Sequence, residues 1–136
     1  MTTRSKKILV VDDEQSIREI MKITLVKLGY VSESAKNGKE ALEILEKEDF
    51  PLILMDLSLP EIDGVELCVR IRKINPDTVI YAFSGGFTEV DSDQLEIMGF
   101  DGHLCKPVKT EVLERAIEGA FEKINKKRER LFIPPL

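Results

Sequence analysis

Five short strand-like segments alternate with amphipathic stretches along this chain, and this alternation restricts its fold more than any other feature. Apolar runs without polar residues, such as residues 8–11 and 52–55, are typical of strands buried on both faces, as in a parallel sheet. Between such runs, apolar residues recur at helical spacing. Alternating strands and helices build a parallel sheet with helices on both faces, so we predict an α/β fold.

These patterns place the predicted elements along the chain. Strands are expected at residues 8–11, 30–35, 52–55, 78–83 and 102–105, with the more polar second strand at a sheet edge. Helices are expected around residues 17–28, 41–45, 65–74, 87–98 and 112–124, the last with the clearest i, i+3, i+4 stripe. Gly29 is expected to end the first helix, Asn37-Gly38 to form a turn, and Ser84-Gly85-Gly86 to end the fourth strand.

The composition limits the class of protein. The chain has 136 residues, of which 43% are hydrophobic and 33% charged, which suits one soluble globular domain. Its net charge of -5 argues against a nucleic-acid binder that uses its whole surface. No apolar run approaches the roughly 20 residues that span a bilayer, and none is long enough for a signal peptide. Cys68 and Cys105 lack metal-binding or CxxC spacing, so we expect reduced thiols in a cytoplasmic protein that does not engage a membrane.

Chemically distinctive side chains follow four of the predicted strands. Asp12 and Asp13 follow the first strand, Asp56 the third, Ser84 the fourth and Lys106 the fifth. In a parallel sheet these strand ends share one edge, which is where open α/β folds bind their ligands. The convergence of these residues at one edge is the central inference from the sequence.

Three carboxylates at one point would repel one another. At about 5 Å and an effective dielectric of about 20, each pair costs roughly 3 kcal/mol, so a cation is expected between them. Oxygen ligands suit a hard ion, and a few carboxylates with water suit Mg²⁺. A carboxylate nucleophile beside Mg²⁺, an ammonium and a hydroxyl is an arrangement for phosphoryl transfer, and a carboxylate needs no general base for that role.

Each of these residues also has a simpler structural interpretation. Asp12, Asp13 or Asp56 can cap a helix, since carboxylates are favoured at helix N-termini. Ser84 can be a turn residue and Lys106 an exposed charge. Their common position at successive strand ends is what favours a shared site.

In combination, these residues resemble those of a two-component response-regulator receiver domain. The matching residues are Asp12-Asp13, Asp56, the downstream Pro60 and Gly64, Ser84 and Lys106-Pro107. The resemblance covers about residues 6–125 and leaves residues 126–136 as a basic, then apolar, C-terminal tail. It implies a flavodoxin-like, doubly wound five-stranded parallel sheet in the order 2-1-3-4-5.

The resemblance also implies a metal site and a phosphorylation site. Asp56 is expected to accept a phosphoryl group from a sensor histidine kinase or a phosphotransfer protein. Mg²⁺ is expected to be held by Asp13, by Asp12 mainly through water, by Asp56 itself and by the backbone carbonyl of Ser58.

The remaining motif residues are implied to respond to the phosphoryl group. Lys106 is expected to contact its oxygens, Ser84 to move and bond them, and the Lys106-Pro107 peptide to be cis. The domain is expected to change its binding of a downstream protein through its fourth helix, fifth strand and fifth helix. It would catalyse at most its own phosphorylation and dephosphorylation, so it is not expected to be an enzyme.

The sequence departs from the family pattern at three positions. The switch position three residues before the lysine, usually Tyr or Phe, holds His103, the only histidine of the chain. His103 is expected either to be a half-exposed strand residue or to act as a smaller, titratable switch that follows Ser84 inward. Gly85 stands where Ala is common, and Ser58 stands where the family varies and tunes dephosphorylation.

The end of the chain is basic from Lys123 to Arg130 and then apolar from Leu131 onward. Basic residues suit a helix C-terminus through the helix dipole. A DNA-binding role is the alternative, but too few residues remain for a recognition module, so direct nucleic-acid binding is not expected. The chain is interpreted as a stand-alone receiver or as part of a longer protein, with a phosphorylation-dependent homodimer as an option.

Two other classes of function fit parts of the pattern. A Mg²⁺-dependent phosphatase with an aspartyl intermediate would need a second Asp two residues after the nucleophile, where this chain has Ser58. A flavodoxin-like cofactor-binding module would need a phosphate-cradling loop after the first strand, where Asp12-Asp13-Glu14 would repel phosphate. A phosphorylation-controlled signalling switch therefore fits the sequence better than either.

Overall fold

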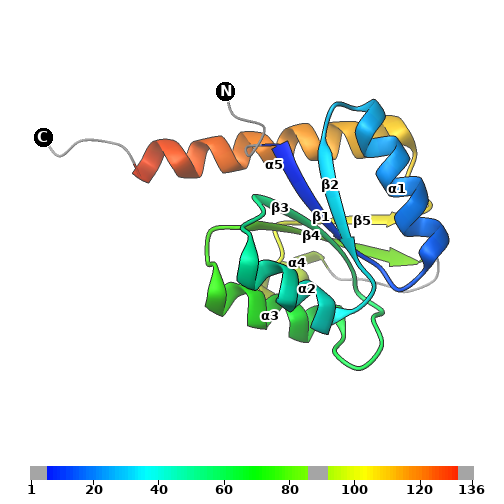
Figure 1. Ribbon diagram of the computed structural model, residues 1–136. Coiled ribbons are helices and arrows are strands. Elements are labelled where there is room, and N and C mark those ends of the chain that lie inside the picture. Colours follow the sequence, from blue (N-terminus) through cyan, green and yellow to red (C-terminus); the bar gives the residue numbers. More distant parts are fainter. Residues whose placement is uncertain (1–5, 86–91, 132–136) are drawn as a thin grey trace, which may run out of the picture.

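A computed structural model of the chain describes residues 6–85 and 92–131 and contains a five-stranded parallel sheet in the order β2-β1-β3-β4-β5 (Figure 1). The strands are β1 (Lys7–Val11), β2 (Val31–Ala35), β3 (Leu52–Asp56), β4 (Val79–Gly85) and β5 (Gly102–Lys106). The helices within the described residues are α1 (Gln15–Lys27), α2 (Gly38–Lys47), α3 (Gly64–Ile74), α4 (Ser92–Met98) and α5 (Thr110–Leu131). The predicted fold class and strand order are confirmed.

The three central strands, β1, β3 and β4, are buried on both faces, and their side chains alternate between two apolar layers. On one side, Leu9, Ile53 and Ile80 pack with Leu67 of α3 and Leu95 of α4. This layer is covered by α2, α3 and α4, which lie below the sheet in Figure 1.

The opposite layer is covered by α1 and α5, which lie above the sheet in Figure 1. Here Ile8, Leu54 and Tyr81 pack with Leu25 of α1 and Ile117 of α5. Because successive strand residues enter different apolar layers, the buried strands show no polar alternation in the sequence.

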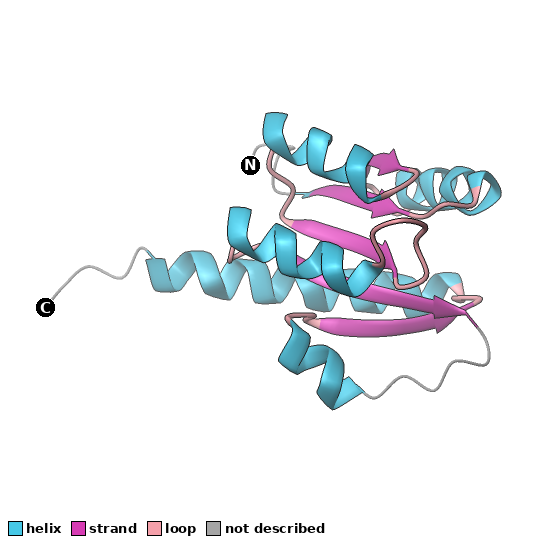
Figure 2. Ribbon diagram, turned by 90° about the horizontal axis from the view of Figure 1, so that it is seen from below, coloured by secondary structure: helices cyan, strands magenta, loops and turns pink. Residues whose placement is uncertain are grey.

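The parallel register brings the carboxyl ends of the strands to one edge, where the arrowheads lie in Figure 2. Asp56 at the end of β3 lies opposite Phe83 of β4, and Gly85 of β4 lies opposite Lys106 of β5. The sequence places the end of the fourth strand at Ser84, but β4 continues through Ser84 to Gly85. The strand is longer than expected because its ladder with β5 continues to Lys106.

The first helix ends at a glycine, as expected. Gly29 has a φ of 91°, its N–H donates to the carbonyl of Val26 at 3.0 Å, and the N–H of Tyr30 donates to that of Leu25 at 2.9 Å. This pair of hydrogen bonds satisfies the last carbonyls of α1 and requires a left-handed residue, which glycine adopts without strain.

The expected turn at Asn37-Gly38 is wrong. Gly38 is the first residue of α2, and Asn37 is its N-cap. The side-chain oxygen of Asn37 accepts a hydrogen bond from the N–H of Glu40 at 2.8 Å. Asparagine is favoured both in turns and at N-caps, and the helix that follows decides between the two.

Helix α5 extends past the amino-terminal edge of the sheet in both views (Figures 1 and 2). Ile124 is its last buried apolar residue up to Arg128, and the helix continues to Leu131. The helix therefore includes the first part of the segment that the sequence assigns to a tail. Residues 132–136 and Gly86 lie outside the described residues.

Within residues 6–85 and 92–131, no helix has both the length and the apolar character needed to cross a bilayer. Cys68 is buried in α3 and Cys105 is exposed on β5, and both are free thiols. Burial raises the pKa of Cys68 to about 11, so this thiol is a poor nucleophile and serves as part of the core.

Candidate functional site

Three carboxylates meet at the carboxyl edge of the sheet. Asp12 directly follows β1, Asp13 comes next, and Asp56 is the last residue of β3. One oxygen atom from each lies within 4.8 Å of those of the other two. Asp12 and Asp56 are only 3% and 6% exposed, whereas Asp13 is exposed. Two of the three negative charges are therefore shielded from water, which strengthens their mutual repulsion.

Lys106 supplies a positive charge to the two buried carboxylates. Its ammonium nitrogen Nζ lies 2.6 Å from Oδ2 of Asp12 and 3.3 Å from Oδ2 of Asp56. Burial lowers the pKa of Lys106, but its hydrogen bond to Asp12 and the charges of Asp12 and Asp56 outweigh burial and raise that pKa above its ordinary value. The interpretation of Lys106 as an exposed charge is wrong, because only 18% of its side chain is exposed. The Lys106-Pro107 peptide is cis, the isomer that the resemblance implies.

Backbone groups hold the other oxygen of each buried carboxylate. The N–H of Glu14 donates to Oδ1 of Asp12 at 2.9 Å, and the N–H of Ser58 donates to Oδ1 of Asp56 at 2.9 Å. Each carboxylate is thus oriented by one backbone donor and by Lys106. Glu14, and not an aspartate, is the N-cap of α1, so helix capping does not account for Asp12.

Arg18 also contacts the site, and sequence reasoning missed it. Its guanidinium donates to the backbone carbonyl of Asp12 at 2.8 Å from the first turns of α1. An arginine on an amphipathic helix is ordinary, so no pattern in the sequence marks this contact. The bond ties α1 to the end of β1, where the acidic pair begins.

Ser84 and His103 meet beside the acidic cluster, on neighbouring strands. The Oγ atom of Ser84 lies 2.7 Å from Nε2 of His103, within hydrogen-bond distance. Ser84 is only 3% exposed, and His103 is half-buried. Burial lowers the pKa of His103 below its ordinary value. His103 is therefore placed as a half-exposed strand residue that also contacts the predicted hydroxyl group.

The loop between β3 and α3 turns back closely on the end of β3. A Cβ at Gly64 would lie 2.5 Å from the carbonyl oxygen of Asp56 and 2.7 Å from Cα of Leu57. After Pro60, Glu61 has a φ of 64°, an uncommon conformation for a residue with a side chain. Glycine is therefore required at position 64 to keep α3 packed directly against the strand end that carries Asp56.

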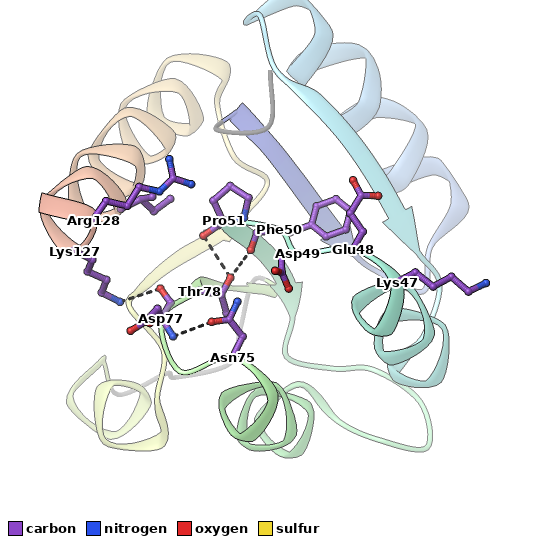
Figure 3. A pocket seen from close by; sticks show the side chains of 11 residues that line it. Lys47, Glu48, Asp49, Phe50, Pro51, Asn75, Asp77, Thr78, Lys127 and Arg128 are labelled. Atoms are coloured by element: carbon purple, nitrogen blue, oxygen red, sulfur yellow. Dashed lines mark hydrogen bonds between the residues drawn. The ribbon is translucent and has the colours of Figure 1, made fainter. Parts of the chain in front are cut away.

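A cavity lies at the opposite edge of the sheet (Figure 3). It has a volume of about 670 Å³ and lies between the loops that precede β3 and β4 and the end of α5. Its wall contains Thr78, whose hydroxyl donates to the carbonyl of Phe50 at 2.6 Å, and both positive and negative side chains surround it. No convergent set of like-charged groups lines this cavity, so the carboxylate edge is the stronger candidate for chemistry.

The family of the chain is indicated by a match to a family model. The model described as "Response regulator receiver domain" matches residues 8–118. This range includes Asp12, Asp13, Asp56, Ser84 and Lys106.

Curated relatives include longer regulatory proteins. A probable transcriptional regulator ycf27 from Porphyra purpurea is 36% identical over 134 residues, which cover 98% of this chain and 55% of the relative. The autoinducer 1 sensor kinase/phosphatase LuxN from Vibrio campbellii is 32% identical over 117 residues, covering 86% of this chain and 14% of the relative. The chain thus spans about half the length of the transcriptional regulators that it matches.

Solved structures share the fold over nearly the whole chain. A CheY-like response regulator receiver domain protein from Methanospirillum hungatei superposes with a TM-score of 0.83 at 31% identity, over 90% of this chain and 98% of the other. NtrX from Brucella abortus gives a TM-score of 0.86 at 26% identity, over 96% of this chain and 31% of the other.

Proposed function

This chain belongs to the response regulator receiver domain family, which acts in phosphorylation-dependent two-component signalling, and we propose that it is a switch operated by phosphorylation of Asp56. The observation that carries this proposal is the pairing of a buried carboxylate with a half-buried ammonium at the carboxyl edge of the sheet. Lys106 lies 3.3 Å from Oδ2 of Asp56 and can balance the charge of a phosphoryl group added there.

The proposed reaction transfers a phosphoryl group from a phosphohistidine of a sensor histidine kinase or a phosphotransfer protein. A carboxylate oxygen of Asp56 attacks the phosphorus atom, the phosphorus–nitrogen bond breaks, and the imidazole leaves. Because the carboxylate carries its own charge, no base is needed to activate it. The chemistry of the chain is confined in this proposal to its own phosphorylation and dephosphorylation.

The acidic cluster fits a magnesium ion. Three carboxylates and one ammonium leave two net negative charges at the edge, and their oxygen atoms are the ligands that Mg²⁺ prefers. Asp12, Asp13, Asp56 and the backbone carbonyl of Ser58 would hold the ion. When bound, Mg²⁺ would neutralise negative charge on the transferred group.

Ser84 and His103 are proposed to relay phosphorylation to the face formed by α4, β5 and α5. Ser84 follows the site along β4 and contacts His103 of β5, which lines a cavity between α4 and α5. Exposed apolar residues lie on the two helices of this face, namely Ile97 at 86% and Val112 at 47% exposure. A downstream protein, or a second copy in a phosphorylation-dependent homodimer, would bind there.

The test is to treat the protein with acetyl phosphate and Mg²⁺ and to measure its intact mass. The addition of one phosphoryl group is expected in the wild type and its absence in Asp56→Asn. Asp49→Asn, an exposed change beside the opposite edge of the sheet, is the matched control and should be labelled like the wild type. If the wild-type protein gains no phosphoryl group either with or without Mg²⁺, the proposal is wrong.

A further inference from the structure

The contact between Ser84 and His103 restricts where one proton can be. The two side chains come from neighbouring strands, and Oγ of Ser84 lies 2.7 Å from Nε2 of His103. A hydroxyl has one proton to donate and lone pairs to accept, whereas each imidazole nitrogen either donates or accepts. The bond therefore runs either from the hydroxyl to a bare Nε2 or from a protonated Nε2 to the hydroxyl oxygen.

A phosphoryl group on Asp56 would allow only one of these two directions. Its oxygens accept hydrogen bonds and have none to donate, so in the proposed relay Ser84 can bond them only by donating its single proton. Ser84 can then keep His103 as a partner only by accepting a hydrogen bond from it. The proton on the imidazole must lie on Nε2 in that state.

On the basis of the proposed phosphorylation of Asp56, we infer that His103 is a positioning residue whose Nε2 proton turns the hydroxyl of Ser84 toward the phosphoryl group. Where Ser84 donates to a bare Nε2 before phosphorylation, phosphorylation reverses the direction of the Ser84–His103 hydrogen bond. The bond thereby couples the state of Asp56 to a side chain on β5, which is half-buried between α4 and α5. A phenylalanine at position 103 could not make this bond, because its ring has no donor or acceptor nitrogen.

The surroundings of His103 favour the uncharged ring before phosphorylation. It lines a cavity of about 300 Å³ beside Glu96 of α4, Asp101 before β5 and Lys123 of α5, which are the charged groups that line this cavity within the described residues. Lys123 donates to the backbone carbonyl of Asp101 at 3.0 Å. Burial lowers the pKa of His103, which favours the uncharged ring, and an uncharged ring with a bare Nε2 can accept a bond from Ser84.

The coupling must work in both directions. A phosphoryl group that takes the proton of Ser84 favours every form of His103 with a proton on Nε2, including the doubly protonated cation. Phosphorylation should therefore raise the pKa of His103, and protonation of His103 should in return favour the phosphorylated form by the same factor.

Nuclear magnetic resonance of the whole chain can follow this proton, since His103 is the only histidine. Long-range ¹H–¹⁵N spectra would be recorded with Mg²⁺, before and after saturation with beryllofluoride, which mimics a phosphoryl group on a carboxylate. The expected result is a shift of the neutral ring toward the Nε2–H tautomer and a higher His103 pKa. If beryllofluoride saturates the protein and neither the tautomer nor the pKa of His103 changes, the inference is wrong. A failure of beryllofluoride to bind would instead overturn the proposed phosphorylation of Asp56.

Two variants separate the hydrogen bond from simple packing. His103→Gln keeps a neutral N–H donor that does not titrate, whereas His103→Phe keeps a ring without a donor. As the pH falls from above the His103 pKa of the beryllofluoride-bound protein to below that of the free protein, wild-type affinity for beryllofluoride should rise, in total by about tenfold for each unit by which the His103 pKa increases. His103→Gln should keep its affinity for beryllofluoride, but that affinity should not depend on pH. His103→Phe should lose both the affinity and its pH dependence. If His103→Phe binds beryllofluoride with wild-type affinity at every pH, His103 has no positioning role. If a variant fails to fold, the spectra of the wild type test the role of His103.

Discussion

Replacing Lys106 by Met tests whether one ammonium holds the acidic cluster together. Methionine keeps most of the apolar length of the side chain and removes its charge. Nζ of Lys106 lies 2.6 Å from Asp12 and 3.3 Å from Asp56, and the side chains of these aspartates are only 4% and 7% exposed. The change therefore leaves two buried carboxylates without their cation.

The size of the effect follows from these distances. With an effective dielectric of about 20, they correspond to upper limits of about 6 and about 5 kcal/mol of attraction. Desolvation of the ammonium offsets much of this. We expect the free energy of unfolding to fall by about 3 to 4 kcal/mol, in the range for breaking a buried ion pair.

Urea unfolding with and without Mg²⁺ measures this effect. With a denaturant slope of about 2 kcal/mol per molar urea, the midpoint should fall by about 1.5 to 2 M. Mg²⁺ at a hundred times its dissociation constant stabilises a folded protein by about 2.7 kcal/mol. At a fixed Mg²⁺ concentration we expect a larger stabilisation of Lys106→Met than of the wild type, because the ion supplies the charge that the variant lacks.

Lys39→Met is the matched control, since Lys39 is exposed on α2, and it should change stability by less than about 0.5 kcal/mol. A loss below about 1 kcal/mol in Lys106→Met, with the same response to Mg²⁺ as the wild type, would refute the electrostatic reasoning.

Three further predictions concern stability. Gly64→Ala should lower the free energy of unfolding by about 2 kcal/mol, because its Cβ would lie 2.5 Å from a backbone oxygen; urea unfolding measures this, and an unchanged midpoint would show that the loop yields freely. Arg72→Lys should lower the free energy of unfolding by about 2 kcal/mol in a thermal unfolding experiment, because lysine cannot reproduce a guanidinium that bonds backbone carbonyls and lies 2.6 Å from Asp101. The control Arg70→Lys, on the exposed side of α3, should lower it little, and equal losses in the two variants would contradict the prediction. Since burial lowers the pKa of His103 below 6.5, the unfolded chain binds the proton more readily, so stability should fall as pH decreases through 6.5. As the pH falls, the free energy of unfolding of the unphosphorylated wild type should therefore decrease relative to that of His103→Gln. If the difference between the two proteins does not vary with pH, this prediction is wrong.

Much of the fold could be predicted because each element carries a local pattern. β1 and β3 are apolar at nearly every position, since both of their faces enter a core, and α5 repeats its apolar residues at helical spacing. Local patterns gave a wrong prediction where the same type of residue is favoured in two different local structures. Asn37 suits both a turn and an N-cap, and in the structure its side chain caps α2.

The candidate site was recognisable because the ends of parallel strands share an edge. Asp12 follows β1, and Asp56 and Lys106 end β3 and β5, so their meeting could be inferred from their order along the chain. The roles implied by the resemblance, including the magnesium ligands and the phosphoryl acceptor, stay predictions for the experiments above. Arg18 could not be singled out, since nothing in its neighbourhood distinguishes it from other helical arginines.

The sequence by itself determined the class of fold, the edge at which chemistry gathers and the types of side chain found there. These depend on the order of residues and on their periodicity, which a linear chain already contains. The tertiary structure decided which atoms meet: Lys106 between two carboxylates, and Ser84 against His103 at 2.7 Å. Such contacts join residues 94, 50 and 19 positions apart, and they depend on strand register and burial, which arise only when the whole sheet is assembled.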